Sequence, residues 1–339
     1  MKIQLRVCFI AIAFLCCAHA LGAEQVVVYR SVKSLVARSV AKRFEKETGI
    51  PVRLVPENRQ PEGEELSDPL IAERNRPRAD LLWSNDPVSA VILKSEGLSV
   101  PYESPNTKNL SKLYSDPEHH WTGFPASAVL ILYNKNVLSD PERIPTSVLD
   151  MMNPRFYGKA CIANPLFGIT SMYAAALFEM LGTDFAEAFF NSLKTNKVAM
   201  LSSTSEVRRR VAAGEFAFGI TDTDDFYTAV KEGKPVGAVF PDQNTFGTLV
   251  IPNALVLLAN APNPEQGKQF IDFLLRPEIQ KILATGDAGQ MPVGLETSVR
   301  EAIPSLNSIK SMEVDYGKLV SESKELSQRF LKEWIKKEK

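Results

Sequence analysis

Residues 25–29, Gln25-Val26-Val27-Val28-Tyr29, form a short β-branched run that is followed at once by the polar pair Arg30-Ser31. Such a run predicts a buried β-strand, and the polar pair marks its carboxyl end. The next stretch, residues 34–49, places apolar side chains at helical spacing and ends on a glycine, as is typical of a helix with a glycine at C′. The folded part of the chain is therefore expected to begin with a strand followed by a helix.

Two more apolar runs follow. Residues 52–55 and 79–83 predict strands, and the second run ends in the polar group Ser84-Asn85-Asp86. Apolar strands that alternate with amphipathic helices predict an α/β fold, with a mostly parallel sheet and helices on both faces. Because ligands of such sheets bind beyond the carboxyl ends of the strands, Ser31, Asn85 and Asp86 are candidate ligand-binding residues.

A second series of alternating strands and helices starts at residue 160. Residues 160–163 predict a strand, and residues 164–169 lead from it into a helix at 170–181. Another strand, at 216–220, ends in Thr221-Asp222-Thr223-Asp224-Asp225. The remaining strands and helices are expected at residues 129–133, 204–213, 254–258, 264–275 and 315–339.

Length and charge limit what the chain can do. At 339 residues it exceeds the usual size of a single hydrophobic core, so two domains are expected. Its 39 Lys and Arg nearly balance its 40 Asp and Glu. A net charge of −1 argues against nucleic acid as a partner, because binding to a phosphate backbone needs a basic excess. A charged ligand must therefore be held by a local site.

Residues 1–23 predict a cleaved secretion signal. Lys2 and Arg6 form its positive start, and the apolar run at 7–17 is about half of the ~20 residues that a membrane span needs. A retained anchor and a lipid attached at Cys16 or Cys17 are the alternatives. Cleavage would leave Cys161 as the one cysteine of the chain, so no internal disulfide is expected. Export through such a signal predicts a periplasmic protein.

Several short motifs occur in a characteristic order. They include Asn164-Pro165-Leu166-Phe167-Gly168 and Gly219-Ile220-Thr221-Asp222-Thr223-Asp224-Asp225, and the others lie at residues 26–31, 44–50, 79–83, 121–124, 251–253 and 270–275. In this order the chain resembles the class II periplasmic substrate-binding proteins of ABC importers, in the branch of the ferric-iron-binding proteins. The resemblance covers essentially the whole chain after the signal. Each motif alone is weak, and their shared order carries it.

This resemblance implies a two-lobed periplasmic-binding-protein fold of type II, in which two α/β lobes are joined by hinge strands and close on a small ligand. Residues 24–125 and 253–300 would form lobe I, residues 126–252 lobe II, and residues 301–339 helices that pack on the lobes. It also implies a monomer that needs no cofactor and delivers a small molecule to an ABC permease with its ATPase. Presentation of the ligand to a sensor kinase is the alternative.

The iron site of this branch is not matched here. The resemblance places Thr223 and Asp224 where those proteins have two adjacent tyrosines, and Asn85 or Asp86 where they have a glutamate. No metal is therefore expected. Ferric iron stays the alternative ligand, held by Asp222, Asp224 and Asp225, because hard cations accept carboxylate oxygens.

Two predicted helices start with hydroxyl side chains that can hold an anion. One begins after Gly168 with Thr170 and Ser171, and the other begins with Ser203 and Thr204. Free N–H groups and the positive end of a helix dipole attract anions, although Ser and Thr at these positions are also ordinary N-caps. We therefore predict a ligand with its own anionic group, an organophosphate or a phosphonate, whose hydroxyls or ammonium face the acidic residues. The candidate ligand-binding residues are Ser31, Asn85, Asp86, Ser127, Gly168, Thr170, Ser171, Ser203, Thr204, Asp222, Thr223, Asp224 and Asp225.

A secreted hydrolase is the alternative from another class. The sequence contains no G-x-S-x-G, H-E-x-x-H or G-x-x-x-x-G-K motif. His119 and His120 lie in a polar stretch that predicts a surface loop, and Cys161 lies in an apolar run that predicts a buried core residue. A binding protein is therefore expected, and not an enzyme.

Overall fold

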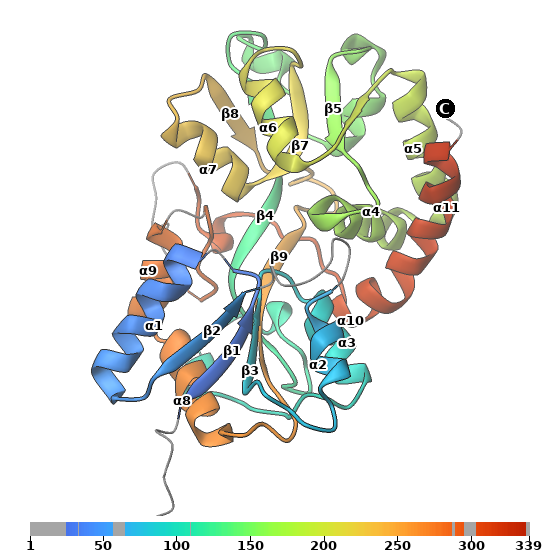
Figure 1. Ribbon diagram of the computed structural model, residues 1–339. Helices are drawn as coiled ribbons and strands as arrows, with labels where there is room; N and C mark the ends of the chain where they lie inside the picture. Colours follow the sequence, from blue (N-terminus) through green and yellow to red (C-terminus); the bar gives the residue numbers. More distant parts are fainter. Residues whose placement is uncertain are drawn as a thin grey trace, which may run out of the picture.

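Two lobes joined by long strands make up the part of the chain that the computed structural model describes, residues 25–32, 34–56, 65–108, 110–286, 289–294 and 303–336 (Figure 1). The predicted signal, residues 1–23, lies outside these ranges. Within them the strands form one nine-stranded sheet, in the order β2-β1-β3-β9-β4-β7-β5-β6, with β8 also paired to β4. The α/β fold class expected from the sequence is confirmed.

Each strand and helix expected from local pattern has a counterpart in the structure, but the helices at 67–72, 88–95, 183–195 and 277–285 and the strands at 199–201 and 236–239 were not predicted. The strands are β1 (Val26–Arg30), β2 (Val52–Pro56), β3 (Leu81–Ser84), β4 (Thr122–Asn134), β5 (Ala160–Ala163), β6 (Ala199–Leu201), β7 (Phe218–Asp222), β8 (Val236–Val239) and β9 (Val250–Leu257). The α-helices are α1 (Ser34–Thr48), α2 (Ser67–Ala72), α3 (Val88–Ser95), α4 (Gly168–Leu181), α5 (Thr183–Thr195), α6 (Thr204–Ala212), α7 (Thr223–Lys231), α8 (Pro264–Leu274), α9 (Pro277–Thr285), α10 (Tyr316–Lys318) and α11 (Lys324–Lys336). Short 3-10 turns lie at η2 (Pro105–Thr107), η3 (Lys112–Tyr114), η4 (Pro141–Arg143), η5 (Val148–Met152), η6 (Pro154–Phe156) and η7 (Leu306–Ser308), and a π-helical turn at η8 (Leu319–Ser323).

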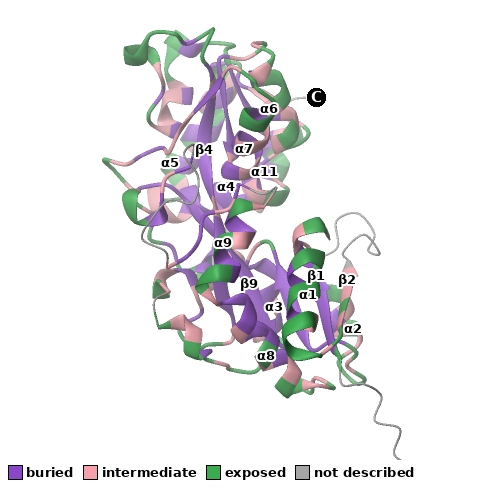
Figure 2. Ribbon diagram, turned by 90° about the vertical axis from the view of Figure 1, so that its left-hand side faces the viewer, coloured by how far each residue is buried: buried purple, intermediate pink, exposed green. Residues whose placement is uncertain are grey.

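Lobe I is the lower lobe in Figure 1 and contains β1, β2 and β3. β1 pairs in parallel with both β2 and β3, and β3 pairs antiparallel with β9. Because side chains alternate along a strand, β1 serves two buried clusters. Val28 lies with Phe44 of α1 and Phe270 of α8, whereas Val27 lies with Leu93 of α3. Figure 2 shows β1 and β9 of this lobe as buried, beside the more exposed helix α1.

Lobe II is the upper lobe in Figure 1 and contains β5, β6, β7 and β8. β5 pairs in parallel with β6 and β7, and β7 pairs antiparallel with the second half of β4. Helix α4 is buried from Thr170 to Phe178, as expected for a helix that is apolar on all sides. Cys161 of β5 is fully buried, which confirms the prediction of a core residue.

The long strands β4 and β9 connect the lobes. The first half of β4 pairs with β9 up to Ala128↔Val250, and its second half pairs with β7 from Val129↔Asp222 onward. The sequence predicted only the second half of β4, because Gly123 and Pro125 are typical strand breakers. Here they lie where the β4–β9 register shifts, between Gly123 and Ala126, and a bulge accommodates a proline. The predicted lobe boundaries at 125/126 and 252/253 fall inside these strands and stay predictions.

The C-terminal segment contacts the connecting strands and both lobes. Tyr316 donates a hydrogen bond from its hydroxyl to the carbonyl of Val250, 2.6 Å away, and Lys324 lies 3.3 Å from Glu65 of lobe I. Phe330 of α11 then packs 5.9 Å from the ring of Phe178 in α4. The single helix expected from residue 315 onward is interrupted by the π-helical turn η8, which contacts both α3 and α4.

Candidate functional site

The carboxyl ends of the parallel strands in both lobes point toward the middle of β4. In lobe I, Ser84 at the end of β3 pairs with Ala254, near the start of β9. In lobe II, Asp222 at the end of β7 pairs with Val129, next to the residue of β4 that pairs with the start of β9. Since β1 runs with β3, and β5 and β6 run with β7, the strand ends of the two lobes form two facing edges. We call these the facing edges of lobe I and lobe II.

The candidates of lobe I lie together on its facing edge. The hydroxyl of Ser31 donates to Asn85 Oδ1 at 2.9 Å and accepts from the backbone N–H of Asn85 at 2.9 Å. Asp86 accepts from the backbone N–H of Val88 at 2.9 Å, at the start of α3. Ser84 Oγ lies 3.4 Å from Ser31 Oγ and joins this group, although it was not among the candidates. Asn85 is exposed and Ser31 and Asp86 are half-buried, so the group reaches the surface.

Arg30 precedes this group but belongs to the interior. It is 5% exposed, and its guanidinium donates from Nη1 to the carbonyl of Val32 at 2.6 Å. Burial lowers the pKa of the Arg30 guanidinium from its usual value. The charge of Arg30 therefore faces the backbone between β1 and α1.

The candidates around α7 connect lobe II to β4. Asp222 is the N-cap of α7 and accepts from the backbone N–H of Asp225 at 2.8 Å. Thr223 is fully buried, and its hydroxyl oxygen accepts from the N–H of Ala128 at 3.3 Å. Ser127 donates from its hydroxyl to Asp224 Oδ1 at 3.3 Å, and both side chains are half-buried. Ser127 and Asp224 thus form a side-chain pair that reaches the surface, whereas Thr223 does not.

Asp225 lies among partners inside lobe II. One of its carboxylate oxygens, Oδ1, accepts from Arg208 Nε at 3.1 Å and from Ser205 Oγ at 3.3 Å. The other, Oδ2, accepts from the hydroxyl of Thr221 at 2.9 Å. The side chains of Asp225 and Arg208 are 11% and 14% exposed. This arrangement is that of a structural ion pair between α6 and α7.

The start of α4 lies on the facing edge of lobe II. Gly168 is exposed and has φ +55°, a conformation that glycine adopts without strain. Ser171 donates from its hydroxyl to the carbonyl of Gly168 at 2.8 Å, and Thr170 is 2% exposed. No side chain caps this helix, whereas Ser203 caps α6 and Asp222 caps α7. The first N–H groups of α4 are therefore the ones on this edge that have no side-chain acceptor among the described residues.

The start of α6 is held by capping. Ser203 accepts from the backbone N–H of Glu206 at 3.2 Å, and Glu206 in turn accepts from the hydroxyl of Ser202 at 2.6 Å. Hydrogen bonds from Ser202, together with the charge of Arg210, lower the pKa of Glu206 to about 2. Thr204, the first residue of the helix, is half-buried.

Groups with catalytic potential lie elsewhere. His119 is exposed, and His120 Nδ1 lies 2.7 Å from the hydroxyl of Ser99 in lobe I. Burial raises the pKa of the Cys161 thiol well above its usual range, so the thiolate nucleophile is disfavoured. Within the described ranges, no three His, Cys, Asp or Glu side chains are arranged to hold a metal ion. No helix of the described chain has the length and apolar character to cross a bilayer.

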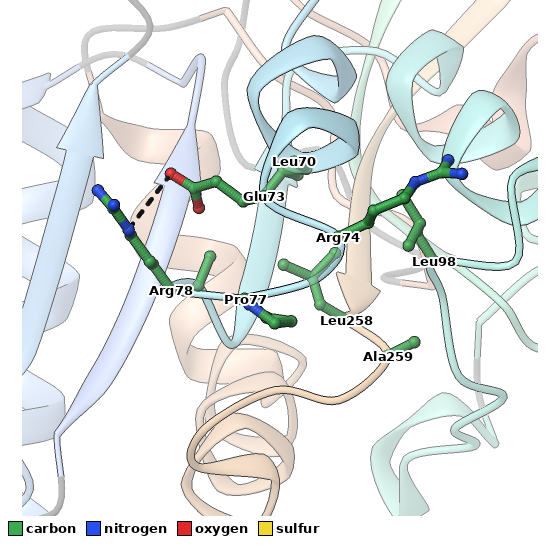
Figure 3. Close-up of a pocket in the computed structure, with 9 residues that line it drawn as sticks. Leu70, Glu73, Arg74, Pro77, Arg78, Leu98, Leu258 and Ala259 are labelled. Carbon is green, nitrogen blue, oxygen red and sulfur yellow. Dashed lines mark ion pairs between the residues drawn. The ribbon is translucent and has the colours of Figure 1, made fainter.

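A shallow pocket lies at the opposite end of lobe I (Figure 3). It is lined by Leu70, Glu73, Arg74, Pro77, Arg78, Ala79, Leu98, Leu258 and Ala259. Its charged side chains have partners within the protein: Glu73 accepts from the hydroxyl of Tyr29 at 3.0 Å and lies 4.0 Å from Arg78. None of the candidate ligand-binding residues lines it, because Ala79 precedes β3 and Leu258 follows β9.

Comparison with known proteins finds relatives over most of the chain. A family model described as bacterial extracellular solute-binding protein matches residues 77–318. The Fe(3+)-binding periplasmic protein of Serratia marcescens is 26% identical over 310 residues, which cover 90% of this chain and 89% of that protein. The putative 2-aminoethylphosphonate-binding periplasmic protein of Salmonella typhimurium is 26% identical over 246 residues, which cover 70% of this chain and 68% of that protein. Among solved structures, a Trichodesmium protein in complex with iron and citrate ligands has a TM-score of 0.79 and 25% identity, and covers 90% of this chain and 99% of its own.

Proposed function

We propose, since this chain belongs to the family of bacterial extracellular solute-binding proteins and has the two-lobed fold of the ferric-binding-protein-like branch, that its ligand is a small organic anion. The family consists of substrate-binding proteins that serve ABC transporters and not of enzymes. The proposed ligand is an organophosphate or a phosphonate, held between the facing edges of the two lobes. The proposed protein is a periplasmic monomer that presents this ligand to an ABC permease with its ATPase.

The start of α4 is the observation that supports an anionic group. A helix N-terminus attracts an anion through its free N–H groups and its dipole. On the facing edge of lobe II, α6 and α7 have side-chain caps and α4 has none. A phosphate or phosphonate oxygen would accept from the N–H groups of Gly168 to Thr170 and from the hydroxyl of Thr170. With a net charge of −1, the chain as a whole would not attract an anion, so this local site would supply the binding energy.

The facing edges also offer groups for the rest of the ligand. Asp224 with Ser127 in lobe II, and Asn85 with Ser31 in lobe I, present carboxylate, amide and hydroxyl groups near the surface. They would pair with hydroxyls or an ammonium of the same molecule. A ligand that contacts both edges stabilises the closed arrangement of the lobes, and an importer can recognise that arrangement.

Iron or an iron chelate is the second candidate, because relatives named for iron match the chain. The carboxylates that would hold ferric iron are partly engaged: Asp222 caps α7, and Asp225 is paired with Arg208. Calorimetric titration with glucose 6-phosphate, 2-aminoethylphosphonate, inorganic phosphate and ferric citrate separates the two. We expect micromolar or tighter binding of an organic phosphate or phosphonate. Tight binding of ferric iron alone would contradict the proposal.

Thr170→Val and Asp224→Ala are expected to weaken binding of the organic anion without unfolding the protein. Each change removes one hydrogen bond to a charged or polar group of the ligand, which corresponds to about a tenfold to hundredfold rise in Kd. Titration calorimetry measures the Kd. Ser192→Ala is the matched control, because its hydroxyl donates to the carbonyl of Phe189 inside α5. Equal affinities in all three variants and the unchanged protein would remove Thr170 and Asp224 from the site.

Partner choice needs a cellular test. Uptake of the radiolabelled ligand should disappear when the cognate permease is deleted. If deletion of the gene for this protein leaves uptake intact but abolishes a transcriptional response to the ligand, the partner is instead a sensor kinase.

A further inference from the structure

Two apolar side chains stand out by their exposure. Among the large hydrophobic residues that the structure describes, Leu35 is 71% exposed and Phe167 is 65% exposed, more than any other. Single exposed apolar residues are common on protein surfaces and by themselves carry no function. The position of these two residues distinguishes them.

Both lie on the facing edges, one in each lobe. Leu35 is in the first turn of α1, which follows the carboxyl end of β1. Phe167 is the N-cap residue of α4, which follows the carboxyl end of β5. The register of the sheet places these two strand ends on opposite sides of the point in β4 where its pairing changes from β9 to β7. An apolar side chain therefore borders the proposed ligand on each side.

The backbone holds Phe167 in place while its ring is left outside the core. Its N–H donates to the carbonyl of Asn164 at 3.3 Å, and its carbonyl accepts from the N–H of Ser171 at 3.2 Å. The next residue, Gly168, takes the positive φ that turns the chain into α4. A side chain held by its backbone contacts a ligand with little loss of conformational freedom, which favours binding.

We propose that Phe167, with Leu35 opposite, contacts the carbon skeleton of the ligand whose anionic group lies at the start of α4. An aromatic ring beside a polar group can contact a molecule with an apolar face, such as the C–H face of a sugar phosphate. It offers no favourable contact to a bare inorganic anion. The inference rests on the proposed function and narrows it. Phe167 makes the site selective for organic over inorganic phosphate.

The test compares two classes of ligand in one variant. Phe167→Ala should raise the Kd for glucose 6-phosphate or 2-aminoethylphosphonate about tenfold or more, because an apolar contact area on the ligand is lost. The Kd for inorganic phosphate should change less than about twofold. Leu35→Ala should show the same selectivity with a smaller rise, and Phe167→Tyr should retain the affinity. Phe185→Ala is the matched control, because Phe185 is a 46% exposed phenylalanine of lobe II in the first turn of α5, a helix that follows α4 and not a strand end.

Three results would overturn the inference. If the unchanged protein binds an organic phosphate and Phe167→Ala binds it equally well, Phe167 is not a ligand contact and the proposed function stands. If Phe167→Ala keeps its Kd but abolishes uptake by cells, Phe167 contacts the permease. If the unchanged protein binds ferric iron and no organic phosphate or phosphonate, the proposed function and the inference both fail.

Discussion

Replacing Asp80 by alanine is expected to lower the free energy of unfolding by about 4 kcal/mol, since leaving a buried donor without an acceptor costs about 1–3 kcal/mol and two backbone donors are involved, besides the side-chain amide of Asn263. Asp80 is fully buried just before β3. Its Oδ2 accepts from the N–H of Val27 at 2.7 Å, and its Oδ1 accepts from the N–H of Asn263 at 2.6 Å. The carboxylate thereby connects β1 to the entry of α8. Urea unfolding followed by circular dichroism measures the loss.

Asp80→Asn is the matched control for this prediction. The amide keeps the shape and one acceptor oxygen but directs an NH₂ group toward a backbone donor, so we expect about half of the loss. Affinity for the ligand at 25 °C should be unchanged in both variants, because Asp80 directly precedes β3 and the facing edge lies at the other end of that strand. A loss below about 1 kcal/mol would show that the two N–H groups find other acceptors.

Replacing Asp225 by alanine is expected to lower the free energy of unfolding by about 3 kcal/mol, because removing one partner of a buried ion pair leaves the other charge uncompensated. The value lies at the low end of the range for such pairs, since Arg208 keeps a second partner, Glu232, at 3.0 Å. The hydroxyl of Thr221 also loses its acceptor. Because Asp225 is directed at Arg208, the Kd for the ligand should change little.

A double substitution isolates the ion pair. Arg208→Met in the Asp225→Ala background removes the uncompensated charge and should restore part of the stability, since apolar replacements of buried pairs are often tolerated. Urea unfolding of the two single variants and the double variant gives the coupling energy. A large rise in Kd with unchanged stability in Asp225→Ala would instead place this carboxylate in contact with the ligand, as the sequence alone suggested.

The three aspartates at the start of α7 show how much of the site can be predicted. The sequence places Asp222, Asp224 and Asp225 together after a strand, and all three carboxylates are equivalent at that level. In the structure one is the N-cap of α7, one is paired with Ser127 near the surface, and one is paired with Arg208. Arg208 belongs to the preceding helix, so this distinction depends on how α6 packs against α7. The spacing of residues within 222–225 does not distinguish the three carboxylates.

The exposure of Phe167 and the contact between Ser84 and Ser31 were also hidden from sequence reasoning. A phenylalanine in an apolar motif is expected to be buried, and Phe167 was part of a motif without being a candidate. Ser84 was predicted as part of the polar group that follows a strand; it is buried, and its hydroxyl lies beside that of Ser31. Exposure and neighbours across strands are tertiary properties, and a single sequence does not contain them.

Local residue patterns determined by themselves the strands β1 and β5, the helices α1 and α4, and the placement of polar groups at strand ends. They did so because side-chain periodicity and glycine conformation act within a few neighbouring residues. Only the tertiary structure decided that β4 continues through Gly123 and Pro125, that the C-terminal segment contacts both lobes, and that Asp225 faces Arg208. Those features depend on register shifts and on packing between segments far apart in the chain, for which no local pattern exists.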